Sequence, residues 1–381
     1  MKSTFIALGL AALIEQSYAF PAIAEEAVRI AAANAPEQKR QLVSPGFNAG
    51  LQYVSNKGAH KFVAPSKTDL RGPCPGLNAM ANHNYIPHNG VATIDQFING
   101  TNYVFGMGLD LATFLATYGA VIDGDLTSWS IGGPPPASLT NGLGLLSQPQ
   151  GISGSHNKYE SDASPTRGDL YEYGNDYLLQ LSQFKDLYNL QKGKTDAQSN
   201  YNLPLLTDFR AYRFNQSINN NPYFFNGPFT GVAVQPAAYT FIYRFMANHS
   251  AEYPEGRLSK SVLKSFFSIT GPDNALKYTP GYEKIPDNWY KRAIGDEYTI
   301  PFFQSDLTNA ALKYPQFLSV GGNTGTTNSF TGVDITNLTG GVYNSQTLLQ
   351  GNNAACFAYQ AAQQGAPDLL KGVFTDTTAA L

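Results

Sequence analysis

The sequence has few cysteines and few charged residues, and both features exclude some classes of protein. Cys74 and Cys356 are the two cysteines among 381 residues, which excludes a disulfide-rich scaffold. Charged residues make up 14% of the chain, well below the roughly 25% of an average soluble protein. With a net charge of −3, no basic stripe is available to neutralise phosphates, so we expect no nucleic-acid partner.

Long apolar runs and internal repeats are also missing. No segment after the N-terminus is long and apolar enough to predict a membrane span, and no repeat or sustained strand alternation is visible. Aromatic residues, in contrast, make up 13% of the chain, together with 36 glycines and 23 prolines. This mixture is typical of a folded, aromatic-lined core with much irregular backbone, and not of disorder.

The first residues have the pattern of a secretory signal peptide. Lys2 precedes an apolar run from Phe5 to Ile14, and small residues follow at Ala19 and Ala24. A positive start, a short apolar stretch and small residues at a cleavage site are typical of such signals. We expect cleavage after Ala19 or Ala24; a buried N-terminal helix is the alternative.

Four Asn-X-Ser/Thr triplets fit a glycosylated, secreted protein. They begin at Asn99, Asn215, Asn248 and Asn337. Each triplet alone is a weak signal, but together with a signal peptide they predict N-glycosylation of the secreted chain.

The remaining pattern predicts one mainly helical domain with long irregular loops. We expect a signal peptide over 1–19, an N-terminal arm or propeptide over 20–60, and the domain over 61–381. Apolar spacing of three and four residues predicts its helices. These span 111–122, 178–188, a segment starting at Pro236, 262–267 and 352–364.

Cys74 lies at a predicted helix start. Pro73 holds it extended, and Pro75, with its preset φ and no N–H, suits the first helical turn. The free amides that follow, from Gly76 and Leu77, point back toward the sulfur and favour a thiolate. Such a cysteine can ligate iron, act as a nucleophile or merely cap the helix in a rigid turn.

The segment from Pro73 to Gly90 closely resembles the signature of the fungal haem-thiolate family that contains chloroperoxidase and the unspecific peroxygenases, longer-chain type. The resemblance covers most of residues 60–270 and continues through Gly90–Thr93, Pro134–Ser138, Glu160–Ser164 with Arg167–Asp169, and Arg213–Pro222. It implies that Cys74 is the axial ligand of a haem b iron and that Pro73, Pro75 and Leu77 contact the cofactor. A thiolate ligand favours cleavage of the O–O bond.

This resemblance implies a secreted oxidoreductase that uses hydrogen peroxide on a small hydrophobic or aromatic organic substrate. A non-catalytic secreted protein that binds haem or a hydrophobic ligand on the same scaffold is the alternative. A third reading, a structural protein stapled by a Cys74–Cys356 disulfide, predicts no haem. Because Cys356 lies in an apolar stretch, we expect it to be a buried free thiol.

An acidic motif follows at Glu160–Ser164. A carboxylate, a backbone carbonyl and a hydroxyl within five residues can supply oxygen ligands to one hard cation, although a solvated turn is the simpler interpretation. In the family that this chain resembles, the matching segment binds Mg2+ or Mn2+ beside a haem propionate. Carried over, the ligands are Glu160, the carbonyl of Ser161 and the hydroxyl of Ser164. The family usually has glycine or histidine where Ser161 stands, and we expect Asp162 to support the loop.

One part of the family pattern is missing. Relatives that activate peroxide place a glutamate over the distal haem face, with an arginine one or two helical turns earlier. These positions fall at Ala237 or Ala238 and near Thr230, none of which is ionisable. Losing a general acid–base costs about a hundred- to ten-thousand-fold in rate.

The catalytic residue is therefore unknown from the sequence, and the candidates are weak. Gln235, Tyr239 and His156 could act, but a core tyrosine or loop histidine is the simpler interpretation. The nearest downstream acids, Glu252 and Glu255, are expected in a surface loop.

Aromatic residues near the distal segment predict an apolar substrate channel. Phe225, Phe229 and Phe241 are its expected lining, with Phe224 and Tyr239 beside them. Plain core packing of these rings is an equal alternative.

Overall fold

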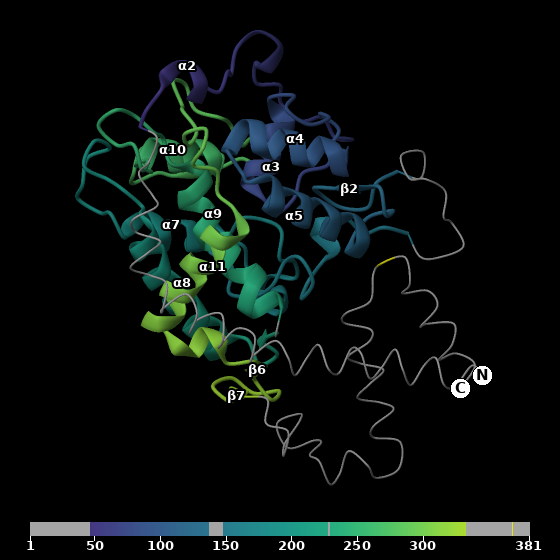
Figure 1. Cartoon of the computed structure of the whole chain (residues 1–381). Coiled ribbons are helices and arrows are strands. Elements are labelled where there is room, and N and C mark those ends of the chain that lie inside the picture. The colour runs from purple at the N-terminus through teal and green to yellow at the C-terminus, as the bar shows by residue number, and fades with distance from the viewer. Residues whose placement is uncertain (1–45, 137–147, 228, 333–367, 369–381) are drawn as a thin grey trace.

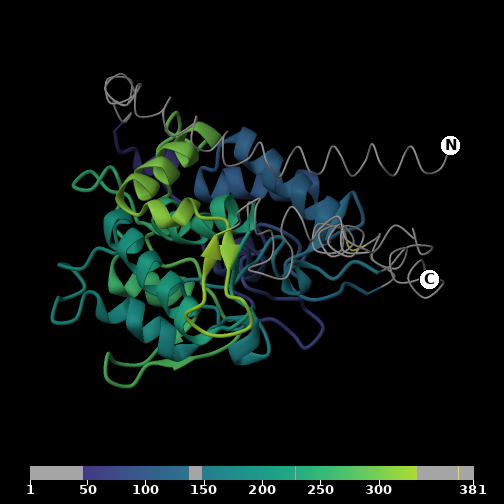
Figure 2. The same cartoon turned by 90° about the horizontal axis from the view of Figure 1, so that it is seen from below.

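The computed structural model describes residues 46–136, 148–227, 229–332 and 368. This part of the chain is mainly α, as predicted, with strands of only two or three residues. The blue helices of the first half and the teal to green helices of the second half lie on different sides of a shared core (Figure 1, Figure 2). The signal peptide and the predicted helix 352–364 lie outside the described residues.

Three helices of the first half bring the cysteine segment onto the core. They are α3 (Pro75–Asn82), α4 (Ile94–Phe105) and α5 (Leu109–Ile122). α4 begins with a capping box between Thr93 and Gln96 and ends at Gly106, whose φ of 65° suits glycine. Between α3 and α4, β1 (Val91–Thr93) pairs antiparallel with β2 (Ser128–Ser130).

β2 also places a tryptophan against two helices. Trp129 stacks on Phe97 of α4 with ring centroids 3.9 Å apart, and its indole N–H donates to Ala116 O of α5. Gly119 allows this approach, since a Cβ there would lie 2.6 Å from the Trp129 ring. The indole thereby fixes α4 and α5 to the small sheet.

The second half supplies the other long helices. They are α7 (Leu181–Asn189), α8 (Leu203–Asn220), α9 (Gln235–Met246), α10 (Lys260–Phe266) and α11 (Ile300–Lys313). The short helices are α2 (Ala49–Gln52), α6 (Leu170–Tyr173), η1 (Gly58–His60), η3 (Ile152–Gly154), η4 (Thr230–Val234, a π-helical turn) and η5 (Pro315–Leu318). β4 (Ile269–Thr270) pairs with β5 (Lys277–Tyr278), and β6 (Gly321–Gly322) lies between β3 (Phe225–Asn226) and β7 (Thr331–Gly332).

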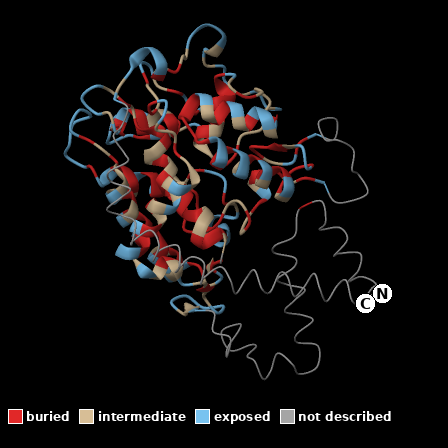
Figure 3. Cartoon of the chain, in the orientation of Figure 1, coloured by how far each residue is buried: buried red, intermediate tan, exposed pale blue. Residues whose placement is uncertain are grey.

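The core is aromatic, and the helices bury one face each (Figure 3). The main cluster includes Trp289 and Tyr298, both fully buried, and draws residues from α3, α4, α5, α7, α9 and α10. A second cluster around Phe214, Phe224 and Phe317 also contains Ala163 of the acidic motif. The acidic loop is therefore packed into the core and not carried as a solvated turn.

The predicted helix 178–188 is wrong at its start. α7 begins at Leu181, and Leu178 is exposed because its N–H donates to Asn175 Oδ1 in the preceding turn. The helices corresponding to 111–122, 262–267 and the segment starting at Pro236 are present as α5, α10 and α9.

Residues 46–60, which the sequence assigns to an arm, lie against the domain. Val54 is buried in the main cluster, and Gln52 Nε2 donates to Lys291 O at 2.8 Å. Among the described residues, no helix combines the length and hydropathy needed to cross a membrane. Of the four glycosylation triplets, Asn99 and Asn215 are exposed and Asn248 is half-buried, while Asn337 lies outside the described residues.

A buried histidine gives the fold a pH dependence. His249 is 3% exposed, its Nδ1 lies 2.7 Å from Pro254 O, and burial lowers its pKa to about 4. Below pH 6.5 the unfolded chain therefore binds a proton that the folded chain does not, so stability falls as the pH drops toward 4. We expect a loss of about 3 kcal/mol from this residue.

The measurement is urea unfolding of the wild type and His249→Gln at pH 7 and pH 4.5. Glutamine keeps a donor for Pro254 O without a titrating ring. The difference in unfolding free energy between the two pH values should be smaller in the variant. Equal differences in both proteins would rule out His249 as the source.

Candidate active site

Cys74 occupies the N-cap of α3, as the flanking prolines predict. Its φ of −86° and ψ of 107° are extended, and Pro75 begins the helix. The Gly72 N–H donates to Asn78 Oδ1 at 3.0 Å, and Asn78 Nδ2 donates back to Gly72 O at 2.9 Å. This reciprocal pair ties the loop before the cysteine to the first turns of α3. The thiol itself is free.

Opposing effects act on the Cys74 thiol. Burial raises its pKa, whereas the backbone amides of Leu77 and Gly76 and the charge of Arg167 lower it. The amides thus face the sulfur electrostatically, although neither makes a helix-capping hydrogen bond to it. A metal ion bound to the sulfur would add a far larger positive charge and hold it as a thiolate.

The acidic loop brings together the three predicted cation ligands. Burial raises the pKa of Glu160 to about 8, and Asp176 adds to this effect, while Arg167, the Ser164 hydroxyl and the Ser161 amide oppose it. The carboxyl group, the hydroxyl and the backbone of Ser161 are therefore within contact of one another. A carboxyl group with so high a pKa favours a positively charged partner when it ionises.

Two aspartates brace this loop from behind. Asp162 Oδ1 accepts from the Leu170 N–H at 3.0 Å, and its Oδ2 accepts from Asn221 Nδ2 at 2.9 Å. Asp169 Oδ1 accepts from the N–H of Ala163 at 3.0 Å. Ala163 is held in the left-handed region at φ 59°, a conformation that a non-glycine residue adopts at a cost. Asp162 thus has the supporting contacts that the sequence predicts.

Two of the weak catalytic candidates contact the same loop. Gln235 Nε2 donates to Ala163 O at 2.7 Å while its Oε1 accepts from Arg210 Nε at 2.7 Å. The Tyr239 hydroxyl donates to the same Ala163 O at 2.6 Å. Their polar atoms therefore hold the acidic loop in place. The sequence gives no signal for this contact.

The third candidate, His156, pairs with a carboxylate. Its Nε2 lies 3.0 Å from Asp162 Oδ1, and the side chain is 26% exposed. Burial of the ring disfavours its cation, but Asp162, Asp176 and Glu160 outweigh that effect and raise the pKa of His156. The pair is an imidazole oriented by a carboxylate, which is the arrangement of many acid–base catalysts.

Cys74, Tyr159 and Glu160 are three partly accessible side chains that lie near one another. Burial raises the pKa of all three, yet each keeps part of its surface accessible. Cys74 interacts electrostatically with both Tyr159 and Glu160. The thiol and the acidic loop therefore belong to one candidate site.

Two buried donor atoms fit a cofactor that carries carboxylates. Arg167 Nε and Ser153 Oγ are buried without a hydrogen-bond partner, whereas the two equally unpartnered carboxyl oxygens of Glu283 suit a donor and not a carboxylate. Arg167 and Glu283 interact electrostatically, and Arg167 also acts on Cys74. Each such atom costs about 1–3 kcal/mol. A thiol, a cation ligand set and free donors together suit a haem, whose iron, ring edge and carboxylates need these contacts.

The predicted substrate aromatics do not form one ring cluster. Phe241 packs on Phe245 at 4.8 Å, whereas Phe225 lies against Gly322 and Phe224 packs on Phe214 in the second core cluster.

Phe229 belongs to a row of aromatic rings that leads to the candidate site. Its ring lies 5.2 Å from that of Tyr118, which in turn lies 5.3 Å from Tyr159. Because Tyr159 interacts electrostatically with Cys74, this row of three rings lies on one side of the candidate site. Tyr118 and Tyr159 were not predicted, since nothing local distinguishes them from core tyrosines.

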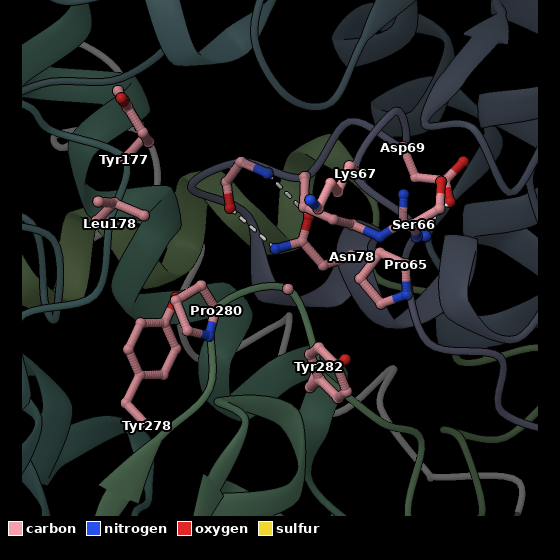
Figure 4. A pocket seen from close by; sticks show the side chains of 13 residues that line it. Pro65, Ser66, Lys67, Asp69, Asn78, Tyr177, Leu178, Tyr278, Pro280 and Tyr282 are labelled. Atoms are coloured by element: carbon pink, nitrogen blue, oxygen red, sulfur yellow. Dashed lines mark hydrogen bonds between the residues drawn. The ribbon is translucent and has the colours of Figure 1, made fainter.

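A separate pocket of about 280 Å3 lies behind α3 (Figure 4). Its walls come from residues 65–72, 177–178 and 278–282, with Asn78 of α3. Its lining combines tyrosine and proline side chains with polar and charged ones, among them Tyr177, Tyr278, Tyr282, Lys67 and Asp69. Asn78 and Gly72 thus separate this pocket from Cys74.

Comparisons with known proteins agree with these observations. The family model described as peroxidase, family 2, matches residues 60–294. The dothistromin biosynthesis peroxidase of Dothistroma septosporum is 44% identical over 98% of this chain and 89% of its own length. An aromatic peroxidase of Fusarium equiseti is 38% identical over 98% and 88%. An aromatic peroxygenase of Coprinellus radians is 32% identical over 67% of this chain and 92% of its own.

Proposed function

Because the chain belongs to peroxidase family 2 and is thus a peroxide-using oxidoreductase, we propose that it is a secreted haem-thiolate peroxidase or peroxygenase with Cys74 as the iron ligand. The observation that carries this proposal is the position of Cys74. Cys74 is the N-cap residue of α3, and its sulfur interacts electrostatically with two backbone amides and with Glu160. Pro73, Pro75 and Leu77 shape the turn and would contact the haem on this side.

When bound, a thiolate-ligated haem supplies the peroxide-driven oxidation of substrate. The chain's own residues would then hold the cofactor and move a proton. Glu160, Ser161 and Ser164 would bind Mg2+ or Mn2+ through a carboxylate, a carbonyl and a hydroxyl. The hydrogen bonds of Gln235 and Tyr239 to Ala163 O fix the position of the loop that carries these ligands.

His156 is the residue that we propose as the proton carrier in place of the missing distal glutamate. Gln235 cannot carry a proton at ordinary pH, and burial raises the pKa of Tyr239 far from neutrality. The imidazole of His156 is partly exposed and oriented by Asp162. Asp162 lies at its Nε2, and an imidazole can gain or lose a proton near neutral pH.

The substrate that we propose is a hydrophobic aromatic molecule. The row of Phe229, Tyr118 and Tyr159 supports this, since aromatic walls favour flat apolar ligands. The printed names of the relatives, a dothistromin biosynthesis peroxidase and an aromatic peroxidase, support an aromatic substrate of biosynthesis.

Two measurements on the purified secreted protein test the function. We expect a thiolate-type absorption band from the carbonyl complex of the reduced protein, and peroxide-dependent product from at least one aromatic or phenolic substrate. The band without product across a panel of aromatic, phenolic and aliphatic substrates would favour a non-catalytic haem-binding protein. Absence of the band would refute the proposal. N-terminal sequencing tests secretion, because secreted protein that begins at Met1 would contradict a signal peptide.

A further inference from the structure

Arg167 is a buried cation whose partner is missing from the described chain. It is 2% exposed, and its Nη1 donates to Thr166 Oγ1 at 3.0 Å. Its Nε is buried without a hydrogen-bond partner. Within residues 46–136, 148–227 and 229–332, no carboxylate lies within ion-pair distance of its guanidinium.

Two other arginines of the chain have partners for their guanidinium groups. Arg244 makes a bidentate pair with Asp306 at 2.8 and 2.7 Å. Arg210 Nε donates to Gln235, and its guanidinium lies 3.8 Å from the Phe317 ring centroid. Arg167 differs from both, because a donor atom of its guanidinium is left over.

The acids nearest Arg167 do not supply the missing contact. Asp169 is bound by the N–H of Ala163, by Asn221 and by Arg213. Glu283 feels the charge of Arg167 more than any other charge, yet both its oxygens are without a hydrogen bond. Arg167 and Glu283 are therefore close but not paired.

The position of Arg167 is next to the candidate cofactor site. Its charge acts on Cys74, on Glu160 and on Glu283. The guanidinium therefore lies near both the thiol and the acidic loop, the two groups that would hold a haem and its cation. A buried cation without a partner is costly, and a planar guanidinium is suited to a carboxylate.

We propose that Arg167 binds a carboxylate side chain of the haem directly, as a hydrogen-bond donor separate from the cation held by Glu160 and Ser164. This inference rests on the proposed function. It gives a reason for the unpartnered Nε of Arg167, which no contact within the described chain explains.

Haem release from the full chain tests the proposal. The rate of transfer to an excess of a haem-scavenging protein is measured for the wild type, Arg167→Met and Arg167→Lys. Each protein carries either natural haem or haem dimethyl ester, whose carboxylates are blocked. We expect Arg167→Met to release natural haem about 10- to 100-fold faster than the wild type. Lysine keeps the charge but not the planar fork, so its rate should fall between the two.

The ester separates a direct contact from general loosening. Wild type and Arg167→Met should release the ester at the same rate, because the contact is absent in both. Faster release of both cofactors by Arg167→Met would indicate a structural role and overturn the inference, as would unchanged release of natural haem. Arg244→Met is the matched control, because Arg244 pairs with Asp306 and has no contact with the acidic loop or the thiol, so it should not distinguish the two cofactors.

The thiolate band keeps this test apart from that of the proposed function. A thiolate-type band should be present in both the wild type and Arg167→Met, although its position can shift because the charge of Arg167 acts on Cys74. Loss of the band in the variant alone would show that Arg167 is needed for iron ligation and would overturn the carboxylate contact. A wild type without any thiolate band would refute the proposed function instead.

Discussion

Replacing Cys74 with serine should abolish the thiolate-type band and lower peroxide-dependent turnover by about a hundredfold or more. Residues that merely orient a metal ligand already cost about 10- to 100-fold when they are mutated, and this change removes the ligand itself. Serine is a favoured N-cap residue, and α3 begins directly after position 74. The variant should therefore keep its helix content, so that loss of the band reports on the iron ligand and not on an unfolded chain; its unfolding temperature should fall to that of the haem-free wild type.

The second cysteine provides the matched control. Cys356 lies outside the described residues, and the haem-thiolate proposal gives it no part in the site. Cys356→Ser should therefore keep both the band and the turnover. If Cys74 and Cys356 instead formed a structural disulfide, the two serine variants would behave alike and neither would lose a pigment. A haem spectrum that survives in Cys74→Ser would remove the foundation of the proposed function.

The parts of the site that the sequence predicts are those built from neighbouring residues. The turn at Cys74 follows from two flanking prolines and the free amides after them, all within the five residues 73–77. The proposed cation ligands Glu160, Ser161 and Ser164 likewise lie in one short loop. Local chemistry of this kind is visible in a single sequence because no distant partner is needed to produce it.

The parts that sequence reasoning missed depend on distant contacts. Gln235 and Tyr239 reach Ala163 O across 72 and 76 residues of chain, so their role in holding the loop has no local pattern. α8 was missed for a related reason. Its inner face carries Arg210 and Arg213, whose burial breaks the apolar period and is acceptable only because Gln235 and Ser164 O accept their hydrogen bonds.

The contact between the acidic loop and α9 also shows what the segment aligned with the distal glutamate does in this chain. In this chain, the start of α9 carries Gln235 and Tyr239, and both hold the loop that carries Glu160. The segment that the resemblance aligns with the distal glutamate therefore holds the acidic loop in this chain. We therefore propose that the acid–base group comes from another element, and His156, which pairs with Asp162 and bridges to Glu160, is the candidate.

Replacing His156 with glutamine should lower peroxide-dependent turnover by about a hundred- to ten-thousand-fold, the usual cost of losing a general acid–base. The amide of glutamine can still donate to Asp162, so the loop should keep its brace, and the thiolate band should not change. An iodosylarene, which delivers its oxygen atom without a proton shuttle, should restore turnover in the variant.

Tyr239→Phe separates acid–base loss from loosening of the loop. It removes the hydroxyl from Ala163 O but leaves Gln235 bonded there, so it should lower the free energy of unfolding by about 1 kcal/mol and leave most of the turnover. His156→Gln should thus lose activity and keep its stability, whereas Tyr239→Phe should lose stability and keep most of its activity. If His156→Gln turned over like the wild type while Tyr239→Phe lost its activity, the proton carrier would be Tyr239, and the support assigned to its hydroxyl would be the catalytic contact.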